Sequence, residues 1–339
     1  MNKRMILYIQ GAILLIESAI MVLPIAAALI YRETSGVWFF YTALAAAICG
    51  FAAMKLSKPR TKTIYAKEGL ITVALGWIVL SLVGALPFTL SGEIPFYLDA
   101  VFEMISGFTT TGSSILPNVE ALSRCMLLWR SFSHWLGGMG ILVFMLAIVK
   151  MEGGQGIHLL RAESPGPTVG KMVPRMVDSS KILYTIYFAL TLVQVVFYLA
   201  GGMPLFDSLC NAFATAGTGG FSVRNSGLAD YSAYLQAVTT VFMILFGVNF
   251  NAYFLLLMRR FRRAAASEEV RAYFLIIAVA VGIITCNIYS MYNGLGEALR
   301  QAAFQVGSII TTTGFSSCDF DLWPTLSKEI LVMLMFVGA

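Results

Sequence analysis

The chain has 339 residues, of which 58% are hydrophobic and only 12% charged, with a mean hydropathy of +0.79 and a formal net charge of +5. An ordinary soluble domain carries about 25% charged residues, so this composition excludes that class and indicates an integral membrane protein.

Apolar runs of membrane-spanning length occur seven times along the chain. A helix needs roughly 20 residues to cross about 30 Å of hydrocarbon. The predicted spans are residues 5–31, 36–54, 69–90, 125–149, 182–206, 234–258 and 272–292. An eighth run starts near Leu326 and stops at Ala339 after about half a crossing. We therefore expect a chain that is shortened at its carboxyl end.

The charged residues predict the orientation of these spans. Seventeen of the 23 lysines and arginines lie before the first span or in the loops at 55–67, 150–181 and 259–271, on one side of the membrane. Because cytoplasmic loops carry the excess of basic residues, we expect a cytoplasmic amino terminus. The opposite loops hold eleven of the 18 acids, including Glu93, Asp99, Glu103, Asp207, Asp230, Glu297, Asp319 and Asp321. These acidic side chains have two interpretations: they concentrate cations at a pore mouth, or they only keep the loops solvated.

A short polar motif recurs between the spans. It reads FTTTGSS at 108–114, TGGFS at 218–222 and TTTG at 311–314. Each copy follows a segment of about ten residues, at 97–108, 205–215 and 297–310, which is too short to cross the bilayer. Aligned glycines also bring Glu103, Asn211 and Gln305 to one position. The sequence therefore predicts a repeated unit of span, re-entrant helix, loop and span.

The re-entrant helices predict a polar environment for the loops. Asp99 and Asp207 follow prolines, and we expect them to serve as N-cap acceptors and as negative charges at the positive helix end. The opposite, carbonyl end then faces the loop, where its partial negative charge favours a cation. Irregular backbone at membrane depth is tolerated only inside protein or beside a water-filled cavity.

The residue types in the loops suit a dehydrated alkali cation. Rings of backbone carbonyls replace the hydration shell of potassium in channels, and glycine allows backbone angles that let successive carbonyls face one axis. Threonine adds a hydroxyl and a stiff side chain, whereas a carboxylate would hold the ion too tightly. The alternative is close helix packing through small residues.

At these residues the sequence resembles the Trk/Ktr/HKT superfamily of potassium transport proteins, and most of all its bacterial TrkH/KtrB branch. The resemblance is carried by FTTTGSS, HWLGGMGILVF (134–144), LLRAESPGPTVGKMVPR (159–175), NAFATAGTGGFS (211–222) and ITTTGFSS (310–317). It implies an all-α polytopic membrane protein built from repeated helix–pore loop–helix units, with two extra helices in front. It further implies uptake of potassium ion across the bacterial inner membrane through a selectivity filter.

By this resemblance the potassium ligands are Thr110, Thr111, Gly112, Thr218, Gly219, Gly220, Thr312, Thr313 and Gly314. Glycine at 112, 220 and 314 argues for potassium, because a serine at the first of these positions goes with sodium preference in some plant relatives. The segments would be 1–67 (two helices), 68–150 (pore unit 1), 151–265 (cytoplasmic loop and pore unit 2) and 266–339 (pore unit 3). The family's fourth pore loop is absent, so we expect an incomplete product.

The resemblance also implies partners. Relatives form homodimers and work with a cytosolic nucleotide-binding subunit of the TrkA/KtrA type, for which the basic loops at 150–181 and 259–271 are docking surfaces unless they bind anionic membrane lipid. We expect no nucleic acid and no organic cofactor. The sequence leaves open whether potassium flows as through a channel or by symport with protons or sodium. It also leaves open whether the shortened chain is a non-functional fragment of a potassium transporter.

Several residues carry two interpretations. The five cysteines show no paired spacing, so neither a disulfide framework nor a zinc site is expected. His134 is either a proton relay or a packed interior group, and we favour the latter. His158 has no partner cluster, and Arg130 and Glu17 are candidates for interhelical pairing. Gly247, with two asparagines after it, predicts a kink, a polar lining or simple packing.

Two other function classes fit the sequence less well. An intramembrane hydrolase or prenyltransferase needs paired catalytic groups, which the two scattered histidines and the acids at 268–269 do not supply. A secondary transporter of another substrate would show inverted repeats, whereas these units repeat in one orientation.

Overall fold

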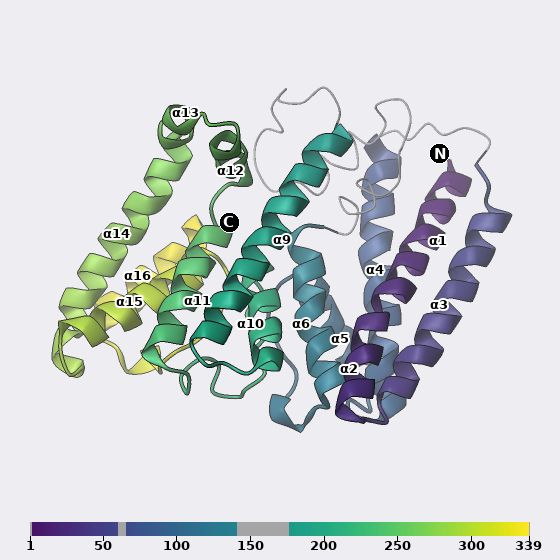
Figure 1. Cartoon of the computed structure of the whole chain (residues 1–339), viewed down its shortest axis with the longest axis horizontal. Coiled ribbons are helices and arrows are strands. Elements are labelled where there is room, and N and C mark those ends of the chain that lie inside the picture. The colour runs from purple at the N-terminus through teal and green to yellow at the C-terminus, as the bar shows by residue number, and fades with distance from the viewer. Residues whose placement is uncertain (1, 60–65, 141–175, 339) are drawn as a thin grey trace. The chain divides into compact units, whose positions relative to one another are not determined.

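The computed structural model describes residues 2–59, 66–140 and 176–338, and the elements within them are helical (Figure 1). The fold class expected from the sequence is thus confirmed. The chain divides into two compact units, Met1–Tyr184 (unit 1) and Thr185–Ala339 (unit 2). The four segments expected from the sequence stay a prediction.

Unit 1 contains three of the predicted spans and one short helix. Its elements are α1 (Lys3–Ile20), α2 (Val22–Tyr31), α3 (Gly36–Leu56), α4 (Ala66–Ser91), α5 (Tyr97–Phe108), η1 (Val119–Ala121) and α6 (Arg124–Gly138). Helices α1 and α2 together form the first span, and α3 and α4 confirm the next two. Of the fourth predicted span, α6 covers the first part, and the rest lies outside the described residues.

Unit 2 repeats this pattern twice. Its elements are α9 (Met176–Ala200, entering from unit 1), α10 (Leu205–Ala216), α11 (Ala233–Phe246), α12 (Phe250–Leu257), α13 (Phe261–Ala265), α14 (Glu268–Ile288), η2 (Tyr289–Met291), α15 (Leu295–Ile310), η3 (Phe320–Leu322) and α16 (Thr325–Val337). Helices α9 and α14 confirm the fifth and seventh predicted spans.

The sixth predicted span is broken, because α11 and α12 meet at an angle of 87°, and the kink that was one interpretation of Gly247 is confirmed. The break falls on three residues, Gly247 to Asn249. Glycine is a poor helix interior residue and a common helix end. The side chain of Asn249 accepts a hydrogen bond from the N–H of Asn251 at 2.9 Å and so caps a new helix.

The three short segments are confirmed as helices, and their re-entrant course stays a prediction. Helices α5 and α10 have 12 residues each and α15 has 16, which at 1.5 Å per residue is less than a bilayer crossing of about 30 Å. The expectation that Asp99 and Asp207 are N-caps was wrong. Phe96 and Pro204 hold that position, and each aspartate lies in the first helical turn, where its charge still favours the positive helix end.

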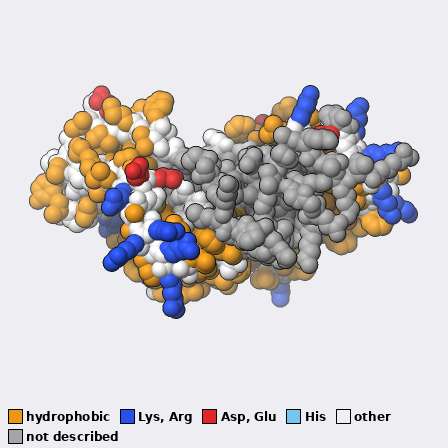
Figure 2. Space-filling model, turned by 90° about the horizontal axis from the view of Figure 1, so that it is seen from above, with side chains coloured by type: hydrophobic (Ala, Val, Ile, Leu, Met, Phe, Trp, Pro, Cys, Tyr) orange, Lys and Arg blue, Asp and Glu red, His pale blue; other side chains and the backbone are white. Residues whose placement is uncertain are grey.

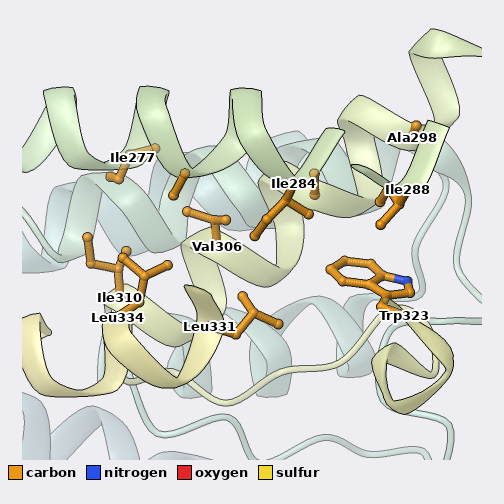
Figure 3. Packing of buried hydrophobic residues seen from close by; sticks show 11 residues of the cluster. Ile277, Ile284, Ile288, Ala298, Val306, Ile310, Trp323, Leu331 and Leu334 are labelled. Carbon is orange, nitrogen blue, oxygen red and sulfur yellow. The ribbon is translucent and has the colours of Figure 1, made fainter. Parts of the chain in front are cut away.

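Each unit has its own tightly packed interior. In unit 1 the ring of Trp129 meets Phe39 and Phe108 edge-on, at centroid distances of 5.9 and 6.0 Å. In unit 2 apolar side chains from α14, α15 and α16 interlock around Ile284, Val306 and Leu331 (Figure 3). Because lipid tails are as apolar as these side chains, close packing holds the helices together. This packing fixes the short helices that carry the loops.

Candidate functional site

Three Thr/Gly loops follow the carboxyl ends of the short helices and share one backbone conformation. We call them loop 1 (residues 110–112, after α5), loop 2 (218–220, after α10) and loop 3 (312–314, after α15). In each, the first and third residues have positive φ angles: 55° and 77° at Thr110 and Gly112, 52° and 74° at Thr218 and Gly220, 57° and 79° at Thr312 and Gly314. A strained backbone angle costs about 1–3 kcal/mol and marks functional sites. The same strain in three copies supports the internal repeat.

The left-handed threonines were missed by the sequence analysis. They occupy the position after a helix end where glycine is usual. Because threonine rarely has a positive φ angle, the residue type did not indicate this conformation. In loop 1 the N–H groups of Thr110 and Thr111 donate to the carbonyls of Gly107 and Ser106, at 3.1 and 2.9 Å. This is the Schellman arrangement of a helix end.

Loops 2 and 3 also return N–H groups to their helices, loop 2 from the same two positions as loop 1 and loop 3 from its first and third residues. The donor–acceptor pairs are Thr218 to Thr215, Gly219 to Ala214, Thr312 to Ile309 and Gly314 to Ser308, at 3.0 to 3.3 Å. Within the described residues, no carbonyl of the nine loop residues accepts a hydrogen bond. Six of the nine loop N–H groups are therefore bonded to their own helices, and the loop carbonyls remain available to a cation.

Loops 2 and 3 touch each other in unit 2. A Cβ built on Gly220 would lie 2.0 Å from the carbonyl oxygen of Thr313, so only glycine fits there. Beyond the loops, the N–H of Leu228 donates to the carbonyl of Ser316 at 2.9 Å. The structure thus brings two of the three predicted ligand sets together. Loop 1 belongs to unit 1, and its meeting with the other two stays a prediction.

The second helix of a repeat passes the end of the short helix at a glycine. A Cβ on Gly137 in α6 would lie 2.2 Å from the carbonyl oxygen of Phe108, the last residue of α5. A Cβ on Gly338, after α16, would lie 2.5 Å from the carbonyl oxygen of Ile310, the last residue of α15. The sequence did not predict these close approaches. They bring α6 and the end of α16 against the carboxyl ends of α5 and α15, where loops 1 and 3 begin.

Paired hydroxyls stiffen loops 1 and 3. Thr311 donates its hydroxyl to the carbonyl of Gly307 at 2.7 Å, and its oxygen lies 2.7 Å from the hydroxyl of Thr313. Since a hydroxyl has one proton, Thr313 must be the donor of that second bond. Thr109 and Thr111 form the equivalent pair at 2.8 Å, whereas loop 2 has glycine at both positions.

We expect Thr313→Val to weaken ion selectivity without abolishing transport. The variant keeps the branched shape but loses one buried hydrogen bond, a net contribution of about 0.5–1.5 kcal/mol. The ratio of potassium to sodium uptake should fall by roughly two- to tenfold. Thr313→Ser, which keeps the hydroxyl, is the control. Equal selectivity of the valine and serine variants would contradict a role for the pair.

A buried ion pair lies behind loop 1. The guanidinium of Arg130 in α6 contacts the carboxylate of Glu103 in α5, and the two side chains are 3% and 0% exposed. The same carboxylate accepts from the hydroxyl of Ser114 at 3.0 Å and from the N–H of Ile115 at 3.0 Å. Interhelical pairing of Arg130 is thus confirmed. The placement of Glu103 among outer-face charges was wrong, because the carboxylate is buried.

The first turn of α10 also carries paired charge. Asp207 accepts a hydrogen bond from the hydroxyl of Tyr231 at 2.7 Å and lies 3.7 Å from the guanidinium of Arg224. Burial and the nearby carboxylate raise the pKa of Tyr231, so the phenol remains a donor. Asp207 therefore contributes less free negative charge to this face than its sequence position indicates.

The remaining candidate residues do not belong to the three loops. His134 is fully buried in α6, as a packed interior group would be. Glu17 is also fully buried, and among the described residues its carboxylate has no hydrogen-bond partner, so the expected pairing is not found. His158 lies outside the described residues. The described residues contain no group of three His, Cys, Asp or Glu side chains that could hold a metal ion.

Known proteins resemble the chain along its whole length. A family described as TrkH, cation transport protein, matches residues 38–339. The Trk system potassium uptake protein TrkH of Halomonas elongata is 36% identical over 100% of this chain and 71% of its own. Its counterpart in Escherichia coli (strain K12) is 33% identical with the same coverage. The crystal structure of the potassium transporter TrkH from Vibrio parahaemolyticus matches with a TM-score of 0.85 and 30% identity, over 100% of this chain and 71% of that one.

Proposed function

Because this chain belongs to the TrkH family of cation transport proteins, we propose that it takes up potassium ions across the bacterial plasma membrane through the three Thr/Gly loops. The relatives from Halomonas elongata and Escherichia coli are named as potassium uptake proteins, which supports this choice of ion. The family assignment itself points to a transporter rather than an enzyme.

One observation carries the proposal: six of the nine loop N–H groups are bonded to their own helices, and within the described residues no loop carbonyl accepts a hydrogen bond. A cation that sheds its water needs replacement oxygens, and preorganised carbonyls supply them without the tight grip of a carboxylate. The helix ends behind the loops add partial negative charge at the same place. We assign the nine loop residues as the ligands on this basis.

The orientation and partners are part of the proposal. The basic loops support an amino terminus in the cytoplasm, with ions entering from the opposite, more acidic face. The relatives are named as proteins of a Trk "system", which supports the proposal that the chain functions together with at least one other protein. We propose a homodimer together with a cytosolic nucleotide-binding subunit.

The experiment is uptake by the chain itself. Purified chain in phosphatidylcholine vesicles should accumulate potassium down its gradient, and should prefer potassium over sodium by at least about tenfold. Expression in a bacterium without its own potassium uptake should restore growth at limiting potassium. Vesicles that take up neither ion, or an organic solute instead, would overturn the proposal.

A further inference from the structure

The segment after the break in the sixth span is a separate surface feature. Helix α12 leaves α11 at 87°, so if α11 runs across the membrane, α12 runs nearly along its plane. In Figure 1, α12 and α13 lie at the end of unit 2 where α14 begins.

This bend is held by side chains from two neighbouring helices. The hydroxyl of Tyr253 in α12 donates to the carbonyl of Leu245 at 2.6 Å, and that of Tyr273 in α14 donates to the carbonyl of Ile244 at 3.0 Å. The carbonyl of Ile244 is one that the end of α11 would otherwise leave without a donor, whereas that of Leu245 also accepts from the N–H of Val248 at 3.2 Å. Asn249 adds a bond from its amide to the carboxylate of Glu269 at 3.0 Å. The bend is therefore a built feature.

The bent segment exposes apolar and basic side chains together. Leu257, Met258 and Phe261 are more than half exposed. Four arginines, Arg259, Arg260, Arg262 and Arg263, surround Phe261 and line an open hollow with it. In the view of Figure 2, lysine and arginine side chains gather over α12 and α13. None of the four arginines forms an ion pair with a described acidic side chain.

We propose that residues 250–265 form an interfacial segment that binds the phosphate headgroups of anionic phospholipids. A helix in the interface plane inserts its apolar side chains at the acyl boundary and directs its basic ones to the headgroups. Arginine suits this role because its planar guanidinium can make two hydrogen bonds to one phosphate. The inference rests on the proposed function for its orientation, which puts this segment on the cytoplasmic, anionic leaflet.

An acidic protein surface is the other class of partner that four arginines could meet. The exposed Leu257, Met258 and Phe261 favour lipid, because a charge-only contact gives these side chains nothing to pack against. Each arginine near an anionic membrane surface contributes about 1 kcal/mol, or on the order of fivefold in affinity. Loss of all four charges should therefore be easy to measure.

The test measures lipid binding, independently of ion flux. The full chain in detergent is titrated with phosphatidylglycerol or phosphatidylcholine, and bound lipids are counted by native mass spectrometry. The variant R259Q/R260Q/R262Q/R263Q should bind phosphatidylglycerol at least roughly tenfold more weakly than the parent. Its matched control, K3Q/R4Q/K55Q/K58Q, removes the same charge from unit 1 and should lose clearly less affinity for phosphatidylglycerol than the arginine variant does.

A second variant separates lipid from protein partners. L257Q/F261Q keeps every arginine but loses apolar contact, and should also weaken phosphatidylglycerol binding by several-fold. Equal binding of both lipids, or equal binding by parent and the arginine variant, overturns the proposal, as does an unchanged L257Q/F261Q. If the parent chain took up no potassium in phosphatidylcholine vesicles, that result would contradict the proposed function. It would not bear on lipid binding, which is measured separately.

Discussion

Replacing Gly220 by alanine should abolish potassium uptake while leaving the helices folded. The added Cβ would lie 2.0 Å from the carbonyl oxygen of Thr313, a backbone atom that cannot rotate away, and the φ of +74° disfavours any side chain. Either loop 2 or loop 3 must move, and a ligand displaced by about 1 Å can cost on the order of 100-fold in rate. The measurement is the initial rate of potassium uptake in vesicles.

Two other glycines separate the causes of this effect. Gly314 has a φ of +79°, but a Cβ added there would meet no atom within 4 Å, so Gly314→Ala adds strain without a clash and should slow uptake less. Gly282 in α14 has open space and an ordinary φ, so Gly282→Ala should leave uptake unchanged. If Gly220→Ala transported as well as Gly282→Ala, loops 2 and 3 would not be the ion path.

Replacing Arg130 by methionine should destabilise the chain and disorder loop 1. The change leaves the carboxylate of Glu103, which is 0% exposed, without its positive partner. Removing one member of a buried ion pair costs about 3–5 kcal/mol. Because Glu103 also holds Ser114 and Ile115 after loop 1, uptake should fall with stability. Thermal unfolding in detergent and potassium uptake are the two measurements.

A double-mutant cycle checks that Arg130 and Glu103 act as a unit. Glu103→Gln alone should also be destabilising, since it leaves a buried guanidinium without its charge partner. Arg130→Met with Glu103→Gln should cost less than the sum of the two single changes, with a coupling of about 1–3 kcal/mol. Additive costs would show that the pair makes no joint contribution.

The short helices were predicted within one or two residues of their observed bounds. Residues 97–108, 205–215 and 297–310 became Tyr97–Phe108, Leu205–Ala216 and Leu295–Ile310. Their amphipathic runs are too short for a span and end at threonine or glycine, and these are local properties that a sequence displays. Gly247 and Asn249 indicated an interruption of the sixth span, but residue type alone could not choose between a kink, a polar lining and packing, and only the structure shows the bend of 87°.

The sequence by itself determined the membrane class, most spans, the repeat and the glycines at 112, 220 and 314. These follow from hydropathy and spacing along the chain. Only the tertiary structure decided that Glu103 is a buried partner of Arg130, that Gly220 lies against Thr313, and that no loop carbonyl accepts a hydrogen bond from the part of the chain that the structure describes. The reason is physical: charge pairing, close approach and hydrogen-bond direction depend on atoms that distant parts of the chain bring together.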